Sequence, residues 1–442
     1  MLLSGKAGFR RLWDLSTRFD RGGRRRLGLL PAAYEKGDNG NHWRTVLLLL
    51  AARLLGLLME RIFLPSAVGE MLAGMVLISV AQFAGPFRPF IEGLPDNEAL
   101  SHVADLGIFF LLLMAGVDMQ LSETVHDARK SFAVALGGVV LPLGAGILLG
   151  FAFLEDGPQR TAQAMLIGVA LSITAIAASA KILQEFGLLK SETGRVLITA
   201  ALFDDIFGLF LLALLSSFIA SGELPGAYAF AIMLAKVIVF FAVTGVLGVH
   251  VYPHISKQIH RRQAAEIEFG ALVIVALVYG FLAELLGLHW AVGAFMAGLF
   301  MERARIGKQP YKSMRLMLNA LTGGILGPLF FAWIGLQANL TAILEIPVFI
   351  VVLIVVAFVT KVLGGGLAAA AIGYGRRDSA IIGVGLAPRG EIMIVVISVA
   401  LAAGLIDGNA ADPVAHHLFS ALIVMALANT VLAPLVLRVL LR

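Results

Sequence analysis

Residues 200–210 read Ala-Ala-Leu-Phe-Asp-Asp-Ile-Phe-Gly-Leu-Phe, so two neighbouring carboxylates, Asp204 and Asp205, stand inside a hydrophobic run. The run extends from Arg195 to Gly222. As a helix rising about 1.5 Å per residue, it places the aspartates roughly 14 Å from Arg195, near the middle of a ~30 Å hydrocarbon core. An ionised aspartate costs about 2.5–3.5 kcal/mol at that depth, so the pair is a hypothesis for a functional site. A structural ion pair or a cap at the membrane edge is the alternative interpretation.

The composition is that of a polytopic membrane protein. Of the 442 residues, 59% are hydrophobic and 14% are charged, whereas soluble domains carry about 25% charged residues. The chain has no cysteine, which excludes disulfides, thiolate metal sites and cysteine nucleophiles. Its net charge of +5 gives no indication of nucleic-acid binding. Residues 1–43 form a basic tail without the apolar core of a cleaved secretory signal.

Thirteen hydrophobic segments follow the tail, and they predict an all-α membrane domain over residues 44–442. The segments lie near residues 44–60, 63–83, 100–119, 131–154, 161–182, 194–219, 228–252, 266–286, 288–302, 315–337, 344–374, 379–404 and 416–438. Lysine and arginine gather in the loops after odd-numbered segments and at the C-terminus, whereas the even-numbered loops hold only Arg88 and Arg160. By the positive-inside rule the C-terminus is cytoplasmic and the N-terminus lies outside, although the charge of the basic tail opposes this orientation.

The two halves of the chain share a repeated pattern. Residues 64–74 and 288–298 both read Leu-x-x-Ala-Val-Gly-x-x-x-Ala-Gly, and two further matches follow in the same order, including Leu-Gly-Gly at Leu136 and Leu363. The matched segments are seven spans apart, so the two copies run in opposite directions. Such inverted-topology repeats are typical of secondary transporters, which bind substrate at the midplane between the repeats. We place the repeats at about residues 63–219 and 288–438.

Each repeat is expected to contain one discontinuous helix, and the two discontinuous helices are expected to cross. In the second repeat, residues 383–391 read Gly-Val-Gly-Leu-Ala-Pro-Arg-Gly-Glu. Pro388 removes a backbone donor and Gly390 lowers helix propensity, so a break is expected there. The matching segment, residues 170–175, has neither proline nor glycine. Its break is inferred from the repeat and from Ser172 and Thr174, whose hydroxyls compete for backbone hydrogen bonds.

Few ionisable residues lie at membrane depth, and they suggest one functional ion pair. Neighbouring residues on a helix point about 100° apart, so one aspartate can line a water-filled cavity while the other reaches a cation on another helix. Lys361 is the candidate for that cation. We interpret Arg389 and Glu391 as a structural ion pair. Arg53 is interpreted as an anchor that reaches the membrane surface, and Lys236 as either such an anchor or a structural residue.

Five motifs resemble those of the monovalent cation:proton antiporter-2 family, over residues 45–440. They are residues 65–74, 106–116, 201–205, 330–336 and 388–391. The Asp-Asp pair with a membrane lysine is similar to that of the electrogenic sodium/proton antiporters within the family. The resemblance implies exchange of Na⁺ or Li⁺ for protons by alternating access. It also implies a homodimer in the lipid bilayer, located in the bacterial inner membrane, with monovalent cations and protons as its partners and no cofactor.

The resemblance also implies roles for individual residues. Asp205 binds the metal cation and, alternately, a proton; Asp204 pairs with Lys361. Ser172 and Thr174 help to coordinate the ion. Members often read Ala-Leu-Ser-Ser-Thr-Ala at this break, whereas this chain has Ile173 in place of the second serine, which leaves the preferred cation open.

Four other functions are alternatives to exchange of Na⁺ or Li⁺ for protons. K⁺/H⁺ exchange is the alternative within the family, and a sodium-coupled solute symporter on a similar fold is a more distant one. A cation channel would need a continuous pore. An intramembrane aspartyl protease needs carboxylates from different helices that share a proton, whereas neighbours on one helix diverge. We therefore expect a transporter and not an enzyme.

Overall fold

The computed structural model describes the chain from His42 to Leu441, except for residues 63, 84–93, 95–96, 119–127, 176–178, 180–182, 184–185, 189–190, 222–226, 251–264, 302–307 and 407–410. Nearly all of the predicted basic tail lies outside the described residues. The chain divides into residues Met1–Leu47 and a second compact unit, Leu48–Arg442. Every regular element in the described part is a helix.

Each of the thirteen predicted segments contains a described helix. The described helices are α2 (His42–Arg61), α3 (Ser66–Phe83), α5 (Glu98–Asp118), α6 (Ala128–Phe153), α7 (Arg160–Ser172), α9 (Glu192–Ser221), α10 (Ala227–His250), α12 (Ala265–Leu285), α13 (Trp290–Leu299), α15 (Lys308–Leu321), η5 (Thr322–Leu326), α16 (Gly327–Gln337), α17 (Ala342–Glu345), α18 (Pro347–Ala371), α19 (Arg376–Gly385), α20 (Glu391–Ala402), α21 (Pro413–His416) and α22 (Leu418–Leu441). Helix α15 begins before its segment, and α21 lies almost wholly between the last two segments. Among the described residues, seven helices are long and apolar enough to cross a membrane, and four are shorter and apolar. The prediction of an all-α polytopic membrane protein is confirmed.

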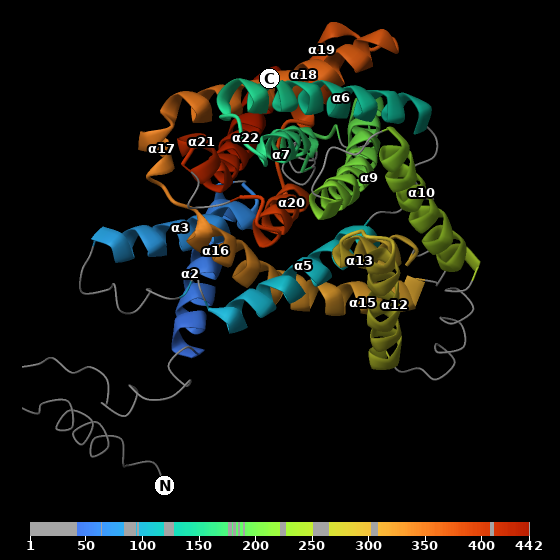
Figure 1. Ribbon diagram of the computed structural model, residues 1–442. Coiled ribbons are helices and arrows are strands. Elements are labelled where there is room, and N and C mark those ends of the chain that lie inside the picture. Colours follow the sequence, from blue (N-terminus) through green and yellow to red (C-terminus); the bar gives the residue numbers. More distant parts are fainter. Residues whose placement is uncertain are drawn as a thin grey trace, which may run out of the picture. The chain divides into compact units, whose positions relative to one another are not determined.

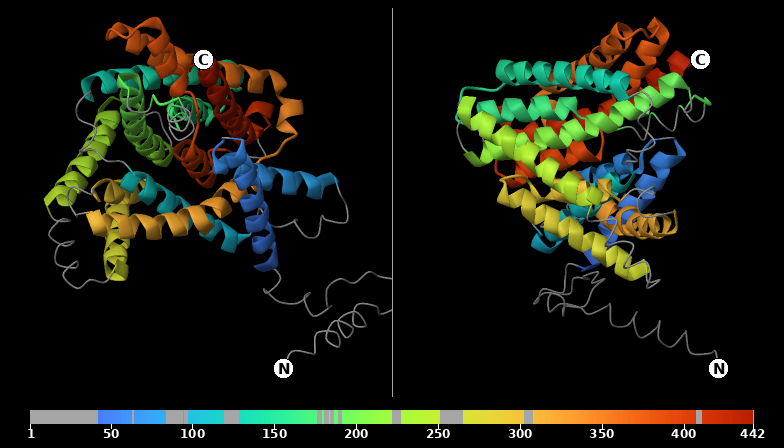
Figure 2. Two further views of the ribbon diagram at one scale, coloured as in Figure 1. Left: turned by 180° about the vertical axis from the view of Figure 1, so that it is seen from behind. Right: turned by 90° about the vertical axis from the view of Figure 1, so that its right-hand side faces the viewer.

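Within residues 48–442 the helices form two groups. We call α6, α7, α9, α18, α19, α20 and α22 the core, because they pack mainly on one another. The second group, the panel, consists of α3, α5, α12, α13, α15, η5 and α16. Helix α10 contacts both α9 of the core and α13 of the panel. Figure 1 shows the core above the panel with α10 at their side, and Figure 2 shows the same separation from two other directions.

The repeated glycines explain how the panel helices cross. A Cβ atom on Gly335 of α16 would lie 2.1 Å from the Met71 carbonyl oxygen of α3, and one on Gly74 would lie 2.0 Å from the Ala332 carbonyl oxygen. A contact this short excludes any side chain. The pair α5 and α13 crosses in the same way, with Gly116 and Gly298 at equivalent places in the repeat.

The central crossing of the core joins the two Leu-Gly-Gly motifs. A Cβ atom on Gly137 of α6 would lie 2.6 Å from the Gly364 carbonyl oxygen, and one on Gly364 of α18 would lie 2.3 Å from the Gly137 carbonyl oxygen. The two matched glycines therefore face each other, as expected when one repeat is related to the other by a two-fold rotation. Small residues that let membrane helices approach closely are the usual basis of such packing.

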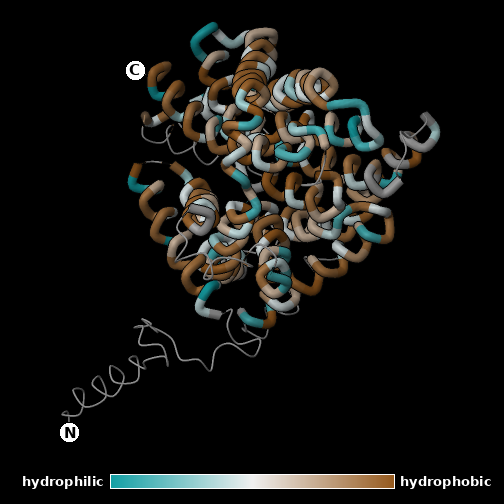
Figure 3. The backbone as a smooth tube through the Cα atoms, turned by 60° about the vertical axis from the view of Figure 1, so that its left-hand side comes forward, coloured by the Kyte–Doolittle hydropathy of each residue, from teal (hydrophilic) through white to brown (hydrophobic). Residues whose placement is uncertain are grey.

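The outer surface of these helices is apolar. Large exposed side chains include Leu54, Val140, Leu148, Ile274 and Val355. Hydrophobic residues predominate along the helices, and hydrophilic residues are found mainly near helix ends and turns (Figure 3). This distribution fits helices whose outer sides contact lipid.

The crossing glycines lead to a first prediction. Gly335→Ala is expected to lower the free energy of unfolding by about 1–3 kcal/mol, because the added methyl group overlaps the α3 backbone. Thermal unfolding in detergent measures the effect. Gly270→Ala in α12 is the matched control, since no heavy atom lies within 4 Å of its Cβ position. Equal stability of the two variants would contradict the close crossing.

Candidate functional site

Two broken helices meet in the middle of the core. Helix α7 ends at Ser172, and Ile173 is extended (φ −83°, ψ 142°). Helix α19 ends at Gly385, and α20 begins only at Glu391. The two extended segments are hydrogen-bonded, because the Ala175 N–H donates to the Pro388 carbonyl oxygen at 2.8 Å. Both helix breaks predicted from the repeat are therefore observed.

Hydroxyl groups from the first repeat satisfy carbonyls that the second break leaves free. The Ser179 hydroxyl donates to the Gly385 carbonyl oxygen at 2.8 Å, and the Thr174 hydroxyl lies 3.0 Å from the Leu386 carbonyl oxygen. The contact between the segments is also tight, since a Cβ atom on Gly390 would lie 2.3 Å from the Ala175 Cβ. Only glycine fits at position 390.

A buried ion pair connects the end of α7 to α9 and α18. The Lys361 ammonium lies 2.8 Å from Asp204 Oδ2 and 3.0 Å from Asp204 Oδ1, and both side chains are fully buried. The same ammonium donates to the Ser172 carbonyl oxygen at the last turn of α7. The structure thus brings together the two residues that the sequence suggested as partners. Three elements that are far apart in the sequence share this one cation.

Arg389 is a second buried cation at the same helix end. Its Nη1 donates to the Ile173 carbonyl oxygen at 2.6 Å, and its Nη2 donates to the Ala357 carbonyl oxygen at 2.9 Å. Lys361 and Arg389 therefore both compensate the negative end of α7, where carbonyl groups lack helical partners. The side chain of Glu391 lies outside the described residues, so its pairing with Arg389 stays a prediction.

Asp205 follows Asp204 directly in the sequence, but its carboxylate has different surroundings. Its side chain is only partly buried, whereas that of Asp204 is fully buried. Asp205 interacts electrostatically with Lys361, but the direct hydrogen bonds of the lysine to a carboxylate go to Asp204. The two neighbouring carboxylates thus have different surroundings, and the more accessible one is Asp205.

The side chains of Ser172, Ile173 and Thr174, at the α7 break, make different contacts. The Ser172 hydroxyl donates to the Val169 carbonyl oxygen of its own helix at 2.7 Å. The Thr174 hydroxyl lies between two acceptors, the Leu386 carbonyl oxygen and the Asp204 carboxylate. Ile173 is fully buried, and its Cγ1 lies 3.0 Å from the place of a Cβ on Gly208, one turn after Asp204. Of these three residues, only Thr174 has a hydroxyl beside the Asp204 carboxylate.

Thr430 of α22 is a site residue that the sequence reasoning missed. Its hydroxyl accepts a hydrogen bond from the Arg389 N–H at 3.1 Å and lies 2.8 Å from the Arg389 carbonyl oxygen. Residues 426–430 read Ala-Leu-Ala-Asn-Thr and residues 201–205 read Ala-Leu-Phe-Asp-Asp, so a further repeat match was present. It places Asn429 at the position of Asp204. The fully buried Asn429 amide has no hydrogen-bond partner among the described residues.

The two membrane cations Arg53 and Lys236 differ in their contacts. Arg53 Nη1 donates to the Gly323 carbonyl oxygen at 2.7 Å, and it lies 3.8 Å from Glu70 Oε1. Gly323 belongs to η5, a π-helical turn that leaves carbonyl groups without their usual partners. The interpretation of Arg53 as an anchor stays a prediction, and the structure adds a contact of its guanidinium with a helix irregularity. Lys236 on α10 is exposed.

Comparison with known proteins agrees with this geometry. A family model described as "sodium/hydrogen exchanger, transmembrane" matches residues 46–442. The chain belongs to the sodium/hydrogen exchanger family. Among curated members, the Na⁺/H⁺-K⁺ antiporter GerN of Bacillus cereus is 28% identical, over 90% of this chain and 95% of the relative. The high-affinity Na⁺/H⁺ antiporter NhaS3 of Synechocystis sp. is 27% identical, over 88% of this chain and 87% of the relative.

A solved structure shares the exchanger fold. The sodium proton antiporter MjNhaP1 of Methanocaldococcus jannaschii superposes with a TM-score of 0.66 at 16% identity, over 89% of this chain and 94% of that chain. Such low identity supports the fold and not the details of the site. The resemblance noticed in the sequence is confirmed at the level of the family of monovalent cation:proton antiporters.

The ion pair leads to a second prediction. Lys361→Met is expected to lower the free energy of unfolding by about 3–5 kcal/mol, because it leaves the Asp204 carboxylate buried without its cation. Asp204→Asn is expected to destabilise by a similar amount for the converse reason. The double variant is expected to lose much less than the sum of the two. Thermal unfolding of the four proteins completes the cycle, and strictly additive losses would show that the two side chains do not interact.

Proposed function

We propose that the chain exchanges a monovalent cation for protons across the membrane, with Asp205 binding the two in turn. The observation that carries this proposal is the accessible Asp205 next to a fully paired Asp204–Lys361, at the crossing of two broken helices. Unwound segments at the midplane provide backbone carbonyls and helix ends as ion ligands in secondary transporters. A small monovalent cation prefers oxygen ligands, and the Asp205 carboxylate and the Thr174 hydroxyl offer oxygen atoms at the break.

Competition for one carboxylate accounts for the exchange. When Asp205 is protonated it offers no charge to a cation, and when a cation is bound the proton has left. A cation beside Asp205 also weakens the attraction between Lys361 and Asp204, because it repels the nearby ammonium. Lys361 is thereby able to release a proton as the cation binds, and to take one up when the cation leaves. Two protons would then exchange for one cation, which makes transport electrogenic at about 2.3 kcal/mol per charge per 100 mV.

Movement of the core against the panel supplies alternating access. The site lies wholly on core helices, and the core contacts the panel through few elements, among them α10 and the contact of α20 with α5. A rigid-body movement of one bundle past the other exposes a fixed site to either side. We place the C-terminus in the cytoplasm from the charge of the loops, and we propose a homodimer in the inner membrane of a bacterium.

Transport in proteoliposomes tests the function. With a pH gradient imposed, addition of Na⁺ or Li⁺ is expected to change the lumenal pH, and an imposed potential is expected to change the rate. A response to K⁺ alone would favour K⁺/H⁺ exchange. A solute symporter would respond only when an organic substrate is added. No response to any of the three cations would contradict exchange.

The role of Asp205 gives a third prediction. Asp205→Asn is expected to abolish exchange, because the amide neither carries charge nor releases a proton at neutral pH. The lumenal pH assay measures the loss at equal protein content. Asp105→Asn is the matched control, since it neutralises a carboxylate on the panel helix α5. Retained exchange in Asp205→Asn would place the cation elsewhere.

Ile173 gives a fourth prediction, about ion preference. Ile173→Ser adds a hydroxyl at the α7 break, so the apparent affinity for Na⁺ and Li⁺ is expected to rise relative to K⁺, by about fivefold for one added polar contact. The concentration of each cation at half-maximal exchange measures the preference. Ile173→Ala is the control for the lost volume. If both variants shift equally, the effect comes from packing against Gly208 and not from the hydroxyl.

A further inference from the structure

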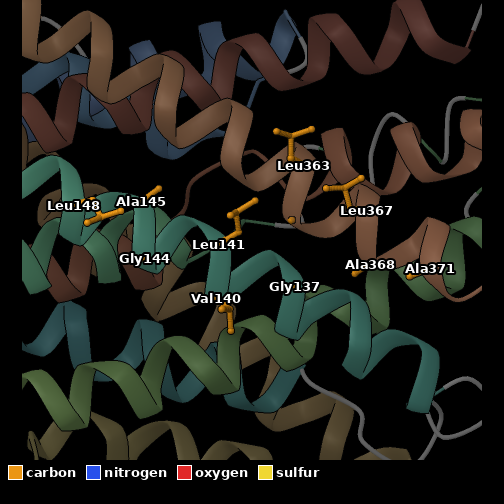
Figure 4. A pocket seen from close by; sticks show the side chains of 11 residues that line it. Gly137, Val140, Leu141, Gly144, Ala145, Leu148, Leu363, Leu367, Ala368 and Ala371 are labelled. Atoms are coloured by element: carbon orange, nitrogen blue, oxygen red, sulfur yellow. The ribbon is translucent and has the colours of Figure 1, made fainter.

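An apolar groove runs along the outer side of the core, between α6 and α18. It has a volume of about 610 Å³, and the described residues that line it are glycine, alanine, valine and leucine. Leu148, Leu363 and Leu367 rise at its edges, and Gly137 and Gly144 line its α6 side (Figure 4). The groove exists because α6 and α18 touch through Gly137 and Gly364, where no side chain separates the two backbones.

The chemistry of the lining restricts what the groove can bind. None of the described residues that line it has a polar side chain, so a ligand with hydrogen-bonding groups would lose its hydration without compensation. Its edges face outward, since Leu148 is 71% exposed and Leu367 is 62% exposed. On the outer side of membrane-spanning helices, an open, wholly apolar groove fits an acyl chain.

Basic residues lie beyond one end of the groove. The start of α6 and the end of α18 lie close together at this end of the groove. The contact that shows this joins Lys130, near the start of α6, to Tyr374, just after α18: the Lys130 ammonium lies 5.4 Å from the centre of the Tyr374 ring. Lys130 and Tyr374 both bind the Glu192 carboxylate, at 2.8 and 2.9 Å. That cluster therefore joins the start of α6 to the turn before α19.

Two exposed arginines flank this cluster. Arg129 precedes Lys130, and Arg376 follows Tyr374 by two residues. Neither has an ion pair among the described residues, whereas the Glu192 carboxylate is already bound to Lys130 and Tyr374 and Asp378 accepts from Thr193. Arginine forks match phosphate oxygens, and basic residues next to a membrane surface attract anionic headgroups.

We infer that this groove binds one anionic phospholipid, with an acyl chain between α6 and α18 and its phosphate at Arg129 and Arg376. The distance between the basic residues and the groove suits a phospholipid. Gly137 lies seven residues beyond Lys130, which is roughly 10 Å along α6. The inference goes beyond cation exchange, since it concerns the surface of the core that faces away from the panel.

The groove lies close to the buried ion pair. A Cβ atom on Gly138, the neighbour of Gly137, would lie 3.8 Å from the Lys361 ammonium nitrogen. One turn of α6 thus has the acyl chain on one side and Lys361 on the other.

Lipid binding to the purified protein tests the inference. The protein in mild detergent is titrated with phosphatidylglycerol or phosphatidylcholine of identical acyl chains, and bound lipid is counted by native mass spectrometry. One phosphatidylglycerol is expected to bind more tightly than phosphatidylcholine. Arg129→Ala and Arg376→Ala are each expected to weaken it by about fivefold, with Arg61→Ala on α2 as the charge control. Equal binding of the two lipids would overturn the headgroup assignment.

A variant that fills the groove provides a second, independent test of lipid binding. Gly144→Phe adds a ring to a residue that lines the groove, and its Cβ has room because no described heavy atom lies within 4 Å of that position. It is expected to abolish the bound lipid, whereas Gly270→Phe, which has equal space on α12, is expected to retain it. Full binding in Gly144→Phe would overturn the inference. So would a change from dimer to monomer without loss of lipid, which would make the groove a contact between two copies.

Discussion

The end of α7 is the constraint on which the core depends. Where the helix stops at Ser172, its last carbonyl groups lose their partners in the middle of a membrane, and such groups cannot be left without donors. Lys361 and Arg389 supply the donors from the second repeat. Lys361 can do so only because Asp204 balances its charge, since an isolated buried ammonium is strongly disfavoured. The break, the lysine and the first aspartate are thus a single structural unit.

Glycine positions carry the rest of the architecture. At the crossings in the panel and in the core, backbone meets backbone, and the same residue type recurs because the two repeats use the same contacts. Hydrophobic burial distinguishes little between helix pairs when lipid is equally apolar. The positions of these glycines, together with the few polar groups at the centre, therefore specify which helices pack against each other.

The sequence predicted the helices and both breaks because hydropathy, loop charge and a repeated pattern each leave a local signature. The break at Ile173 has no proline or glycine, and it was inferred from its partner segment around Pro388 and from the hydroxyls of Ser172 and Thr174. The partners of Arg389 could not be predicted, because they are carbonyl groups, and every residue carries one. Thr430 was predictable in principle from the match between residues 201–205 and 426–430. Two identities in five positions are too few to be noticed before the structure is known.

Asn429 has a consequence for the energetics of the whole assembly. The two repeats are related by a nearly two-fold rotation. If they exchanged conformations, the protein would have a similar structure that is open to the other side of the membrane. The charges on the two repeats are not symmetric, because the first repeat has two carboxylates where the second has an amide and a hydroxyl. The inward-facing and outward-facing forms therefore cannot be degenerate. The charge in one half of the molecule contributes to their difference in free energy, and a proton or cation shifts the balance only by as much as it binds one form better than the other.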